Sequence, residues 1–200
     1  MGPRPGMRPA RRGMRRPVRP PLPPHPDLAA AREDVASAHQ LMAAGEYGAA
    51  CDLFSRVAAL AAGHQHFRRA GQLYAQAAQA AIKDGNLALA TSHADRAIAT
   101  LIQGGNFPHA VRVVKRIQSE LRAHGHEAEA KSLRAKLEAR LDELGLALSD
   151  VEASATPPAP QRELPAECHA CLGPVRSDEV EWIDDSSATC AYCGSTLQAI

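Results

Sequence analysis

Four cysteines near the end of the chain form two pairs whose spacing suits a metal ion. Cys168 and Cys171 make one C-x2-C pair, and Cys190 and Cys193 make a second pair after eighteen intervening residues. Each pair can offer two thiolates from one tight turn, and Zn2+ prefers four such ligands in a tetrahedron. Four thiolates fill that shell and leave no position for water, so we expect one structural Zn2+ and no catalytic metal. Iron held by the same thiolates is the alternative, and a dithiol redox role is disfavoured because no βαβ pattern surrounds the pairs.

The segment between the pairs predicts how they are brought together. Residues 180–183 alternate as a strand, 184–187 are rich in turn residues, and 188–190 return as a second strand. Gly194 suits the positive φ of such a turn, whereas Leu172 stands where the first pair would have its glycine. So small a module buries too little apolar surface to fold alone, and we expect the metal to stabilise it. Residues 166–200 resemble the zinc-ribbon family, and that resemblance implies the four cysteines as ligands.

Other residues that could bind metal or react have simpler interpretations. Cys51 lies on an apolar helical face and is interpreted as a core residue, with a reactive thiol as the alternative. Two His-x-His pairs, at 64–66 and 124–126, fall in turns at opposite ends of an up-and-down array, so we interpret them as loop histidines. His169 lies inside the first cysteine pair and could replace a cysteine as ligand. A basic stripe on one helix is interpreted as a solvated face: Arg112, Lys115, Arg116 and Arg122.

The middle of the chain carries an internal repeat that indicates helices. Glycines stand at 45, 85, 105, 125 and 145, in steps of twenty residues with position 65 missing from the series. The nearest glycine there is Gly63, and the residue pattern that follows the other glycines begins two residues later after it. A step of twenty fits one helix and a short turn in which glycine ends the helix. Asn86 and Asn106 can cap the helices that follow, and Pro108 fits a first turn. The expected helices are 28–43, 46–62, 66–84, 87–103, 107–123 and 126–144, in three antiparallel hairpins.

These hairpins resemble the tetratricopeptide (TPR) class of helical repeat. Gly45, Tyr47, Ala50 and Phe54 fit its small–aromatic–small–aromatic frame, although the period is nearer forty residues than thirty-four and the closing prolines are missing. The predicted fold class is therefore mainly α, a TPR-like array followed by a small β zinc ribbon. The expected division is a disordered Arg/Pro-rich tail at 1–26, the array at 27–148, a proline-containing linker at 149–165 and the ribbon at 166–200. The whole arrangement resembles uncharacterised bacterial zinc-ribbon proteins, which brings no assigned activity.

Charge is distributed unevenly along the chain. Residues 1–26 contain seven Arg and no acid, whereas residues 163–200 contain seven acids and one Arg. The first segment lacks the apolar run of a secretory signal, no stretch is long and apolar enough to cross a bilayer, and the paired cysteines suit a reducing compartment. We therefore expect a cytoplasmic protein without membrane association.

The function predicted from the sequence is a non-enzymatic protein–protein interaction adaptor. Helical arrays offer an extended binding surface, and the chain has no phosphate-binding glycine loop, no GxSxG elbow and no HExxH motif. The alternative is weak, non-specific nucleic-acid binding through the Arg-rich tail, which has no aromatic residue for base stacking. A third hypothesis is attraction between the basic tail and the acidic ribbon. The sequence names neither the partner nor the oligomeric state.

Overall fold

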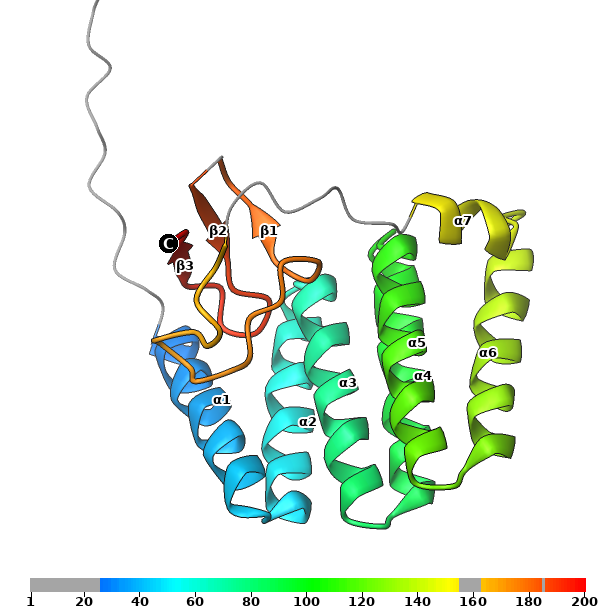
Figure 1. Ribbon diagram of the computed structural model, residues 1–200, viewed down its shortest axis with the longest axis horizontal. Coiled ribbons are helices and arrows are strands. Elements are labelled where there is room, and N and C mark those ends of the chain that lie inside the picture. Colours follow the sequence, from blue (N-terminus) through cyan, green and yellow to red (C-terminus); the bar gives the residue numbers. More distant parts are fainter. Residues whose placement is uncertain (1–25, 155–162, 185) are drawn as a thin grey trace, which may run out of the picture.

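The computed structural model describes residues 26–154, 163–184 and 186–200, and six long helices dominate them (Figure 1). The helices run up and down side by side, each packing on the next, as hairpins do. This confirms the predicted fold class, a helical array followed by a small sheet. The six bounds are α1 (Pro26–Ala44), α2 (Tyr47–Gly63), α3 (Phe67–Lys83), α4 (Leu87–Gln103), α5 (Phe107–Ala123) and α6 (Glu127–Asp142).

The turns between helices follow the twenty-residue step without a slip. Each glycine of that step has the left-handed backbone expected after a helix, with φ between 68° and 82°. At the missing position it is Gln65, not Gly63, that has this backbone, with φ 61°. The repeat therefore continues in register through Gln65, two residues after Gly63, and Phe67, Ala70 and Tyr74 lie in α3 as this unit's pattern predicts. Asn86 caps α4 by accepting a hydrogen bond from the Leu89 N–H at 3.1 Å, but Asn106 makes no such cap.

Helix α3 is buried on almost all sides, and small residues make this possible. Residues 70–78 of α3 are all buried between α2, α4 and the C-terminal segment. At Gly71 a Cβ would lie 2.4 Å from Cγ of Leu101 on α4, so only glycine allows the observed approach of the two helices. Alanine fills most of the other contact positions, which keeps the helices close and the array compact.

The array ends in a sparsely packed helix and a short one that the sequence analysis did not predict. Helix α6 buries a thin seam that includes Leu133 and Leu137, and its other faces are exposed. Helix α7 (Leu148–Ser154) lies where a linker was expected; it buries Leu148 and Val151 next to α5 and α6. Seven residues with only two apolar anchors give too short a pattern to recognise beforehand. The predicted tail, 1–26, lies almost wholly outside the described residues, as do residues 155–162, and the expected domain division stays a prediction.

Three short strands form the C-terminal sheet. They are β1 (Glu181–Trp182), β2 (Ser187–Thr189) and β3 (Thr196–Gln198), antiparallel and in the order β1-β2-β3. The β1–β2 hairpin matches the prediction, whereas β3 follows the second cysteine pair and was not expected. Ala188 is the central residue, paired with Trp182 on one side and Leu197 on the other. Below, residues 163–200 are called the ribbon.

The ribbon packs against the array, and one hydrophobic core runs through both. In Figure 1 it lies beside the upper ends of α1 and α3, while α7 lies at the other side of the array. Every hydrogen bond and ion pair found between the described residues of ribbon and array involves α1, α3 or α5. We call the surface formed by these three helices the odd-helix face.

Candidate metal centre

The two cysteine pairs form turns with the same backbone hydrogen bonds. In the first turn the Cys168 N–H donates to the Gly173 carbonyl and the Leu172 N–H to the Cys168 carbonyl, at 2.9 and 2.8 Å. The corresponding bonds of the second turn join Cys190 with Ser195 and Gly194, at 2.8 and 3.0 Å. Leu172 has φ 57° and Gly194 has φ 73°, so leucine takes the left-handed conformation that glycine takes in the second turn. The departure from glycine therefore leaves the first turn unchanged in shape.

The sheet brings the two turns together so that four thiols converge. All four cysteines are buried, and their sulfur atoms lie within 4.8 Å of one another. The Sγ atoms of Cys168 and Cys193 are 3.7 Å apart, and those of Cys171 and Cys190 are 3.8 Å apart. Four sulfurs around a zinc ion at the usual bond length of about 2.3 Å would be separated by about 3.8 Å. The donor set and its spacing fit a tetrahedrally bound metal ion such as zinc.

The protonation of these thiols makes metal binding dependent on pH. Hydrogen bonding to the other thiols and burial raise the pKa of Cys171, and the pKa of Cys190 is raised to about 12. Hydrogen bonds from Cys171 and Cys190 lower the pKa of Cys193. Without a metal the cluster therefore keeps protons that a metal must displace, because a thiolate is the form that binds zinc.

Two arginines from the array lie beside the metal centre. Nε of Arg32 on α1 donates to the Cys193 carbonyl at 3.4 Å. Arg69 on α3 lies against Gly194, where an added Cβ would collide with its guanidinium. A zinc ion held by four thiolates would carry a net charge of −2, which these two positive charges would offset. Glycine at position 194 therefore allows both the positive φ of the turn and the close approach of the Arg69 side chain.

Glu179 is the centre of the buried polar contact between ribbon and array. Its carboxylate forms an ion pair with Arg116 of α5 and accepts a hydrogen bond from Nε2 of Gln72 on α3 at 2.7 Å. Only 5% of the Glu179 side chain and 11% of the Arg116 side chain are exposed. A buried carboxylate is stable only with such a charged partner and further hydrogen bonds. Arg116 therefore faces the ribbon, and the prediction of a solvated face is wrong at this residue.

Tyr192, inside the second cysteine pair, extends the same network. Its hydroxyl accepts a hydrogen bond from Nε2 of Gln76 at 2.9 Å and lies 3.3 Å from the Glu179 carboxylate. Its ring packs edge-on against the ring of His39 on α1, with centroids 5.1 Å apart. The residue that follows Cys190 by two thus inserts between α1 and α3, and it directly couples the metal-binding turn to the array.

A buried histidine continues this network into α5. Nε2 of His109 lies 3.0 Å from Oε1 of Gln72, so the Gln72 amide joins His109 to Glu179. Burial, followed by the positive charges of Arg68 and two further arginines, lowers the pKa of His109 to about 3. His109 is therefore neutral at pH 7 and acts as a hydrogen-bonding spacer.

Arg68 secures the edge of the ribbon. Its Nη2 atom donates to the carbonyls of Glu179 and Val180 at 2.8 and 3.0 Å, and its Nη1 atom pairs with Glu181 at 3.3 Å. The acidic charge of the ribbon is thus partly neutralised by the array, a contact that the sequence analysis did not consider.

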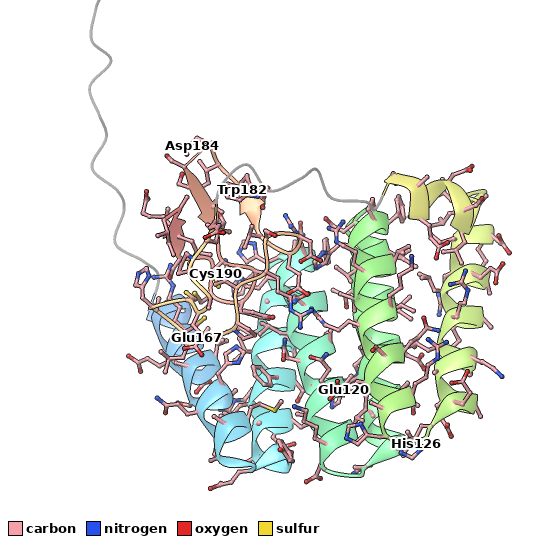
Figure 2. All side chains as sticks on the ribbon, in the orientation of Figure 1. Glu120, His126, Glu167, Trp182, Asp184 and Cys190 are labelled. Carbon is pink, nitrogen blue, oxygen red and sulfur yellow. The ribbon has the colours of Figure 1, made fainter. Side chains whose placement is uncertain are left out.

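The remaining candidate residues lie away from this centre. Cys51 is buried in the array, and burial raises its pKa to about 11, which suits a core residue. The two His-x-His pairs fall in the α2–α3 and α5–α6 turns, which lie at opposite ends of the array, so they do not meet. His169 is exposed and is not part of the sulfur cluster. Figure 2 shows Cys190 at the base of the ribbon near the helices, with Asp184 at its outer tip.

Sequence reasoning found the four cysteines but missed the residues that dock them. Glu179 was counted only as one acid among seven, and Tyr192 was not considered at all. A signal was present in α3, where Gln72 and Gln76 stand four residues apart within an alanine-rich stretch. Two polar residues on one face of a central helix indicate a polar partner.

Comparison of the chain with protein-family models, curated proteins and solved structures gives no match in any of the three. No helix within the described ranges has the length and apolar character that a bilayer crossing requires. The functional argument therefore depends on the residues and their geometry.

Proposed function

We propose that this protein is a non-enzymatic protein-interaction adaptor in which one structural Zn2+ holds a zinc ribbon against a TPR-like array. The array holds the ribbon in place through the Glu179 and Tyr192 contacts. The ribbon is then the part that presents a docking surface to the partner.

The structural role of zinc is supported by the sulfur cluster. Four thiols within 4.8 Å of one another supply a complete tetrahedral shell, which leaves no position for a substrate or for an activated water. A closed shell of this kind supports a non-catalytic protein, and reduced thiols support a cytoplasmic location. Metal analysis separates zinc from iron, since iron in four thiolates has visible absorption and zinc does not.

The exposed apolar side chains carry the adaptor proposal. Among the residues that the structure describes, the large exposed apolar ones are Leu60 and Leu144 on the array and Leu172, Ile183 and Ile200 on the ribbon. The ribbon contributes three of these five although it is far shorter than the array. Ile183 is 59% exposed at the end of β1, beside the half-buried Trp182. Trp182 and Ile183 are thus adjacent apolar residues between the exposed acids Glu181 and Asp184, and such a combination supports a surface that binds another protein.

The test is affinity capture with a matched pair of variants. Ile183→Asn changes an exposed apolar residue of the ribbon, and Leu144→Asn makes a similar change on the array, where the residue is 53% exposed. Full-length, zinc-loaded protein would be used as bait in native lysate, once with nuclease and once without it. We expect Ile183→Asn to lose a protein partner that the wild type and Leu144→Asn retain.

Two outcomes would reject the adaptor proposal. A partner set unchanged by Ile183→Asn would show that the ribbon surface is not the docking site. Recovery of nuclease-sensitive material alone, lost when residues 1–26 are deleted, would instead favour nucleic-acid binding by the Arg-rich tail.

A further inference from the structure

His109 lies at the junction between the array and the ribbon. The residue is in the first turn of α5, is only 3% exposed, and its Nε2 atom lies 3.0 Å from Oε1 of Gln72. The amide nitrogen of the same Gln72 donates to Glu179 at 2.7 Å and lies 3.3 Å from the hydroxyl of Tyr192. A change at His109 is therefore transmitted through one amide group to the residues that dock the ribbon.

The Gln72 amide determines which nitrogen of His109 carries the hydrogen. Nε2 of Gln72 donates to the Glu179 carboxylate, so the other amide atom, Oε1, is the one that faces His109. Oε1 can only accept a hydrogen bond. Nε2 of His109 must therefore carry a hydrogen and donate it.

The opposite side of the ring leads to the same tautomer. Nη2 of Arg112 lies 3.4 Å from Nδ1 of His109, and a guanidinium can only donate. Nδ1 must then accept, so it carries no hydrogen. Both contacts are satisfied by one tautomer of the neutral ring, and a proton on Nδ1 would place two donors against each other.

The charges around His109 provide no counter-ion for a protonated ring. Burial, followed by the positive charges of three arginines on α3 and α5, lowers its pKa to about 3. Three acids of the ribbon already face these three arginines. They are Glu181 with Arg68, Glu179 with Arg116, and Asp178 near Arg112. A proton on His109 would thus add a positive charge to a set that is already balanced.

The other charged groups near His109 do not change this balance. A cavity of about 300 Å3 opens beside the ring, between the first turns of α3 and α5 and the ribbon. The exposed His66 and the cation Arg69 line it, and Cys190 lines it from the metal centre, whose negative charge Arg32 and Arg69 would offset. Among the described residues that line the cavity, none from the α4–α5 turn is charged.

We propose that His109 makes the contact between ribbon and array sensitive to pH, and that acid weakens the docking of the ribbon by protonating this histidine. The ring can take up a proton only by leaving its place between Arg112 and Gln72, which removes the support that the Gln72 amide gives to Glu179. The proposal goes beyond the adaptor function and does not depend on it, because it concerns a contact within the chain.

The direction of the effect follows from the lowered pKa of His109. An unburied histidine has a pKa of about 6.5, whereas burial and the nearby arginines lower that of the docked residue to about 3. The undocked state therefore takes up the proton first as the pH falls. Docking is at full strength above about pH 6.5 and weakens from there toward about pH 3. Between pH 7.5 and pH 5.5, His109 should weaken the docking equilibrium about tenfold.

The test measures the stability of the docked ribbon in zinc-loaded, full-length protein at pH 7.5 and pH 5.5, by urea unfolding followed by Trp182 fluorescence. Free zinc is kept in excess, and bound zinc is measured in every sample. His109→Gln keeps a donor and an acceptor on the side chain but does not titrate. Its docking equilibrium should therefore lose about tenfold less between the two pH values than that of the wild type.

The matched control is His124→Gln, an exposed change at the C-terminal end of α5, which should weaken in acid as the wild type does. Other groups that gain protons in acid, the buried His39 among them, act equally on all three proteins. The proposal is overturned if the wild type and His109→Gln weaken by the same factor between pH 7.5 and pH 5.5.

A second measurement keeps the proposal testable if His109→Gln is unstable. NMR of zinc-loaded wild type with nitrogen-15 in its histidines reports which ring nitrogens carry hydrogen. We expect His109 to remain neutral, with its hydrogen on Nε2, from pH 7.5 down to pH 6.0. A hydrogen on Nδ1 instead, or protonation of His109 near pH 6.5, would equally overturn the proposal.

Discussion

The array and the ribbon are stabilised by different kinds of buried contact. The array packs many small apolar side chains against one another, and no single residue dominates its core. The ribbon has few apolar side chains and is organised by four sulfur atoms and by the polar contacts of Glu179 and Tyr192. Stability is therefore distributed in the array and concentrated in a few atoms of the ribbon. Changes to single residues should affect the two regions in different ways.

Removal of the metal should have the largest effect. We expect a chelator, or Cys171→Ser, to unfold the ribbon and leave most helices intact, because structural zinc contributes on the order of 10 kcal/mol that the small sheet cannot replace. Trp182 is the only tryptophan in the chain, so its fluorescence reports on the ribbon, while far-ultraviolet circular dichroism reports on the helices.

The control for that experiment is Cys51→Ser, which makes the same chemical change within the array. It should leave the metal content and the Trp182 fluorescence unchanged. Loss of the helical signal together with the ribbon signal on chelation would contradict the proposed difference between the two regions.

Breaking the buried ion pair should have the next largest effect. Glu179→Gln leaves the Arg116 guanidinium buried without its counter-ion, which should destabilise the docked ribbon by about 3–5 kcal/mol. Glu181→Gln is the matched control: its carboxylate is 70% exposed and pairs with Arg68 at the edge, so the expected loss is under about 1 kcal/mol. Urea unfolding followed by Trp182 fluorescence measures both, and equal losses would show that burial of Glu179 does not matter.

The array should be most sensitive where its helices approach each other most closely. Gly71→Ala places a methyl group against Leu101, so overpacking of about 1–3 kcal/mol should outweigh a helix-propensity gain of up to about 1 kcal/mol. Gly63→Ala meets no atom within 4 Å and should stabilise α2 by up to about 1 kcal/mol. Thermal unfolding followed by circular dichroism compares them, and the reverse order would show that the α3–α4 contact is loose.

The smallest effect is expected at the left-handed residue of the first cysteine turn. Leu172→Gly removes the steric penalty of φ 57° from a side chain that is 44% exposed, and should stabilise zinc-loaded protein by about 0.5–1 kcal/mol. Competition with a zinc chelator of known affinity measures the gain as a tighter zinc affinity of the variant. A weaker hold on zinc in Leu172→Gly would mean that the leucine side chain contributes a contact that outweighs the strain.

The sequence allowed the array and the ligands to be predicted because their signals are local. A glycine step of twenty and an apolar face on each helix determine where helices end, and even the exception at Gln65 stays in register. The two C-x2-C pairs are equally local. The Ala-rich pattern that predicted α3, however, does not reveal which of its faces meets the ribbon.

The docking of the ribbon could not be predicted because it depends on contacts across more than a hundred residues of sequence. Gln72 and Glu179 are 107 positions apart, and Gln76 and Tyr192 are 116 apart. The two glutamines indicate that a polar partner exists, but Glu179 and Tyr192 look like ordinary surface residues until the fold brings them close. Helix α7 and strand β3 were missed for a related reason, since both are short and gain stability mainly from the elements they contact.

A crystal structure of the full-length protein with anomalous data collected at the zinc edge tests the central claim most directly. We predict a single zinc peak bonded to Cys168, Cys171, Cys190 and Cys193 at about 2.3 Å, with Tyr192 inserted between α1 and α3 and Glu179 paired with Arg116. A ribbon that binds zinc but stands away from the odd-helix face, or a sulfur cluster joined by disulfides without metal, would contradict the account.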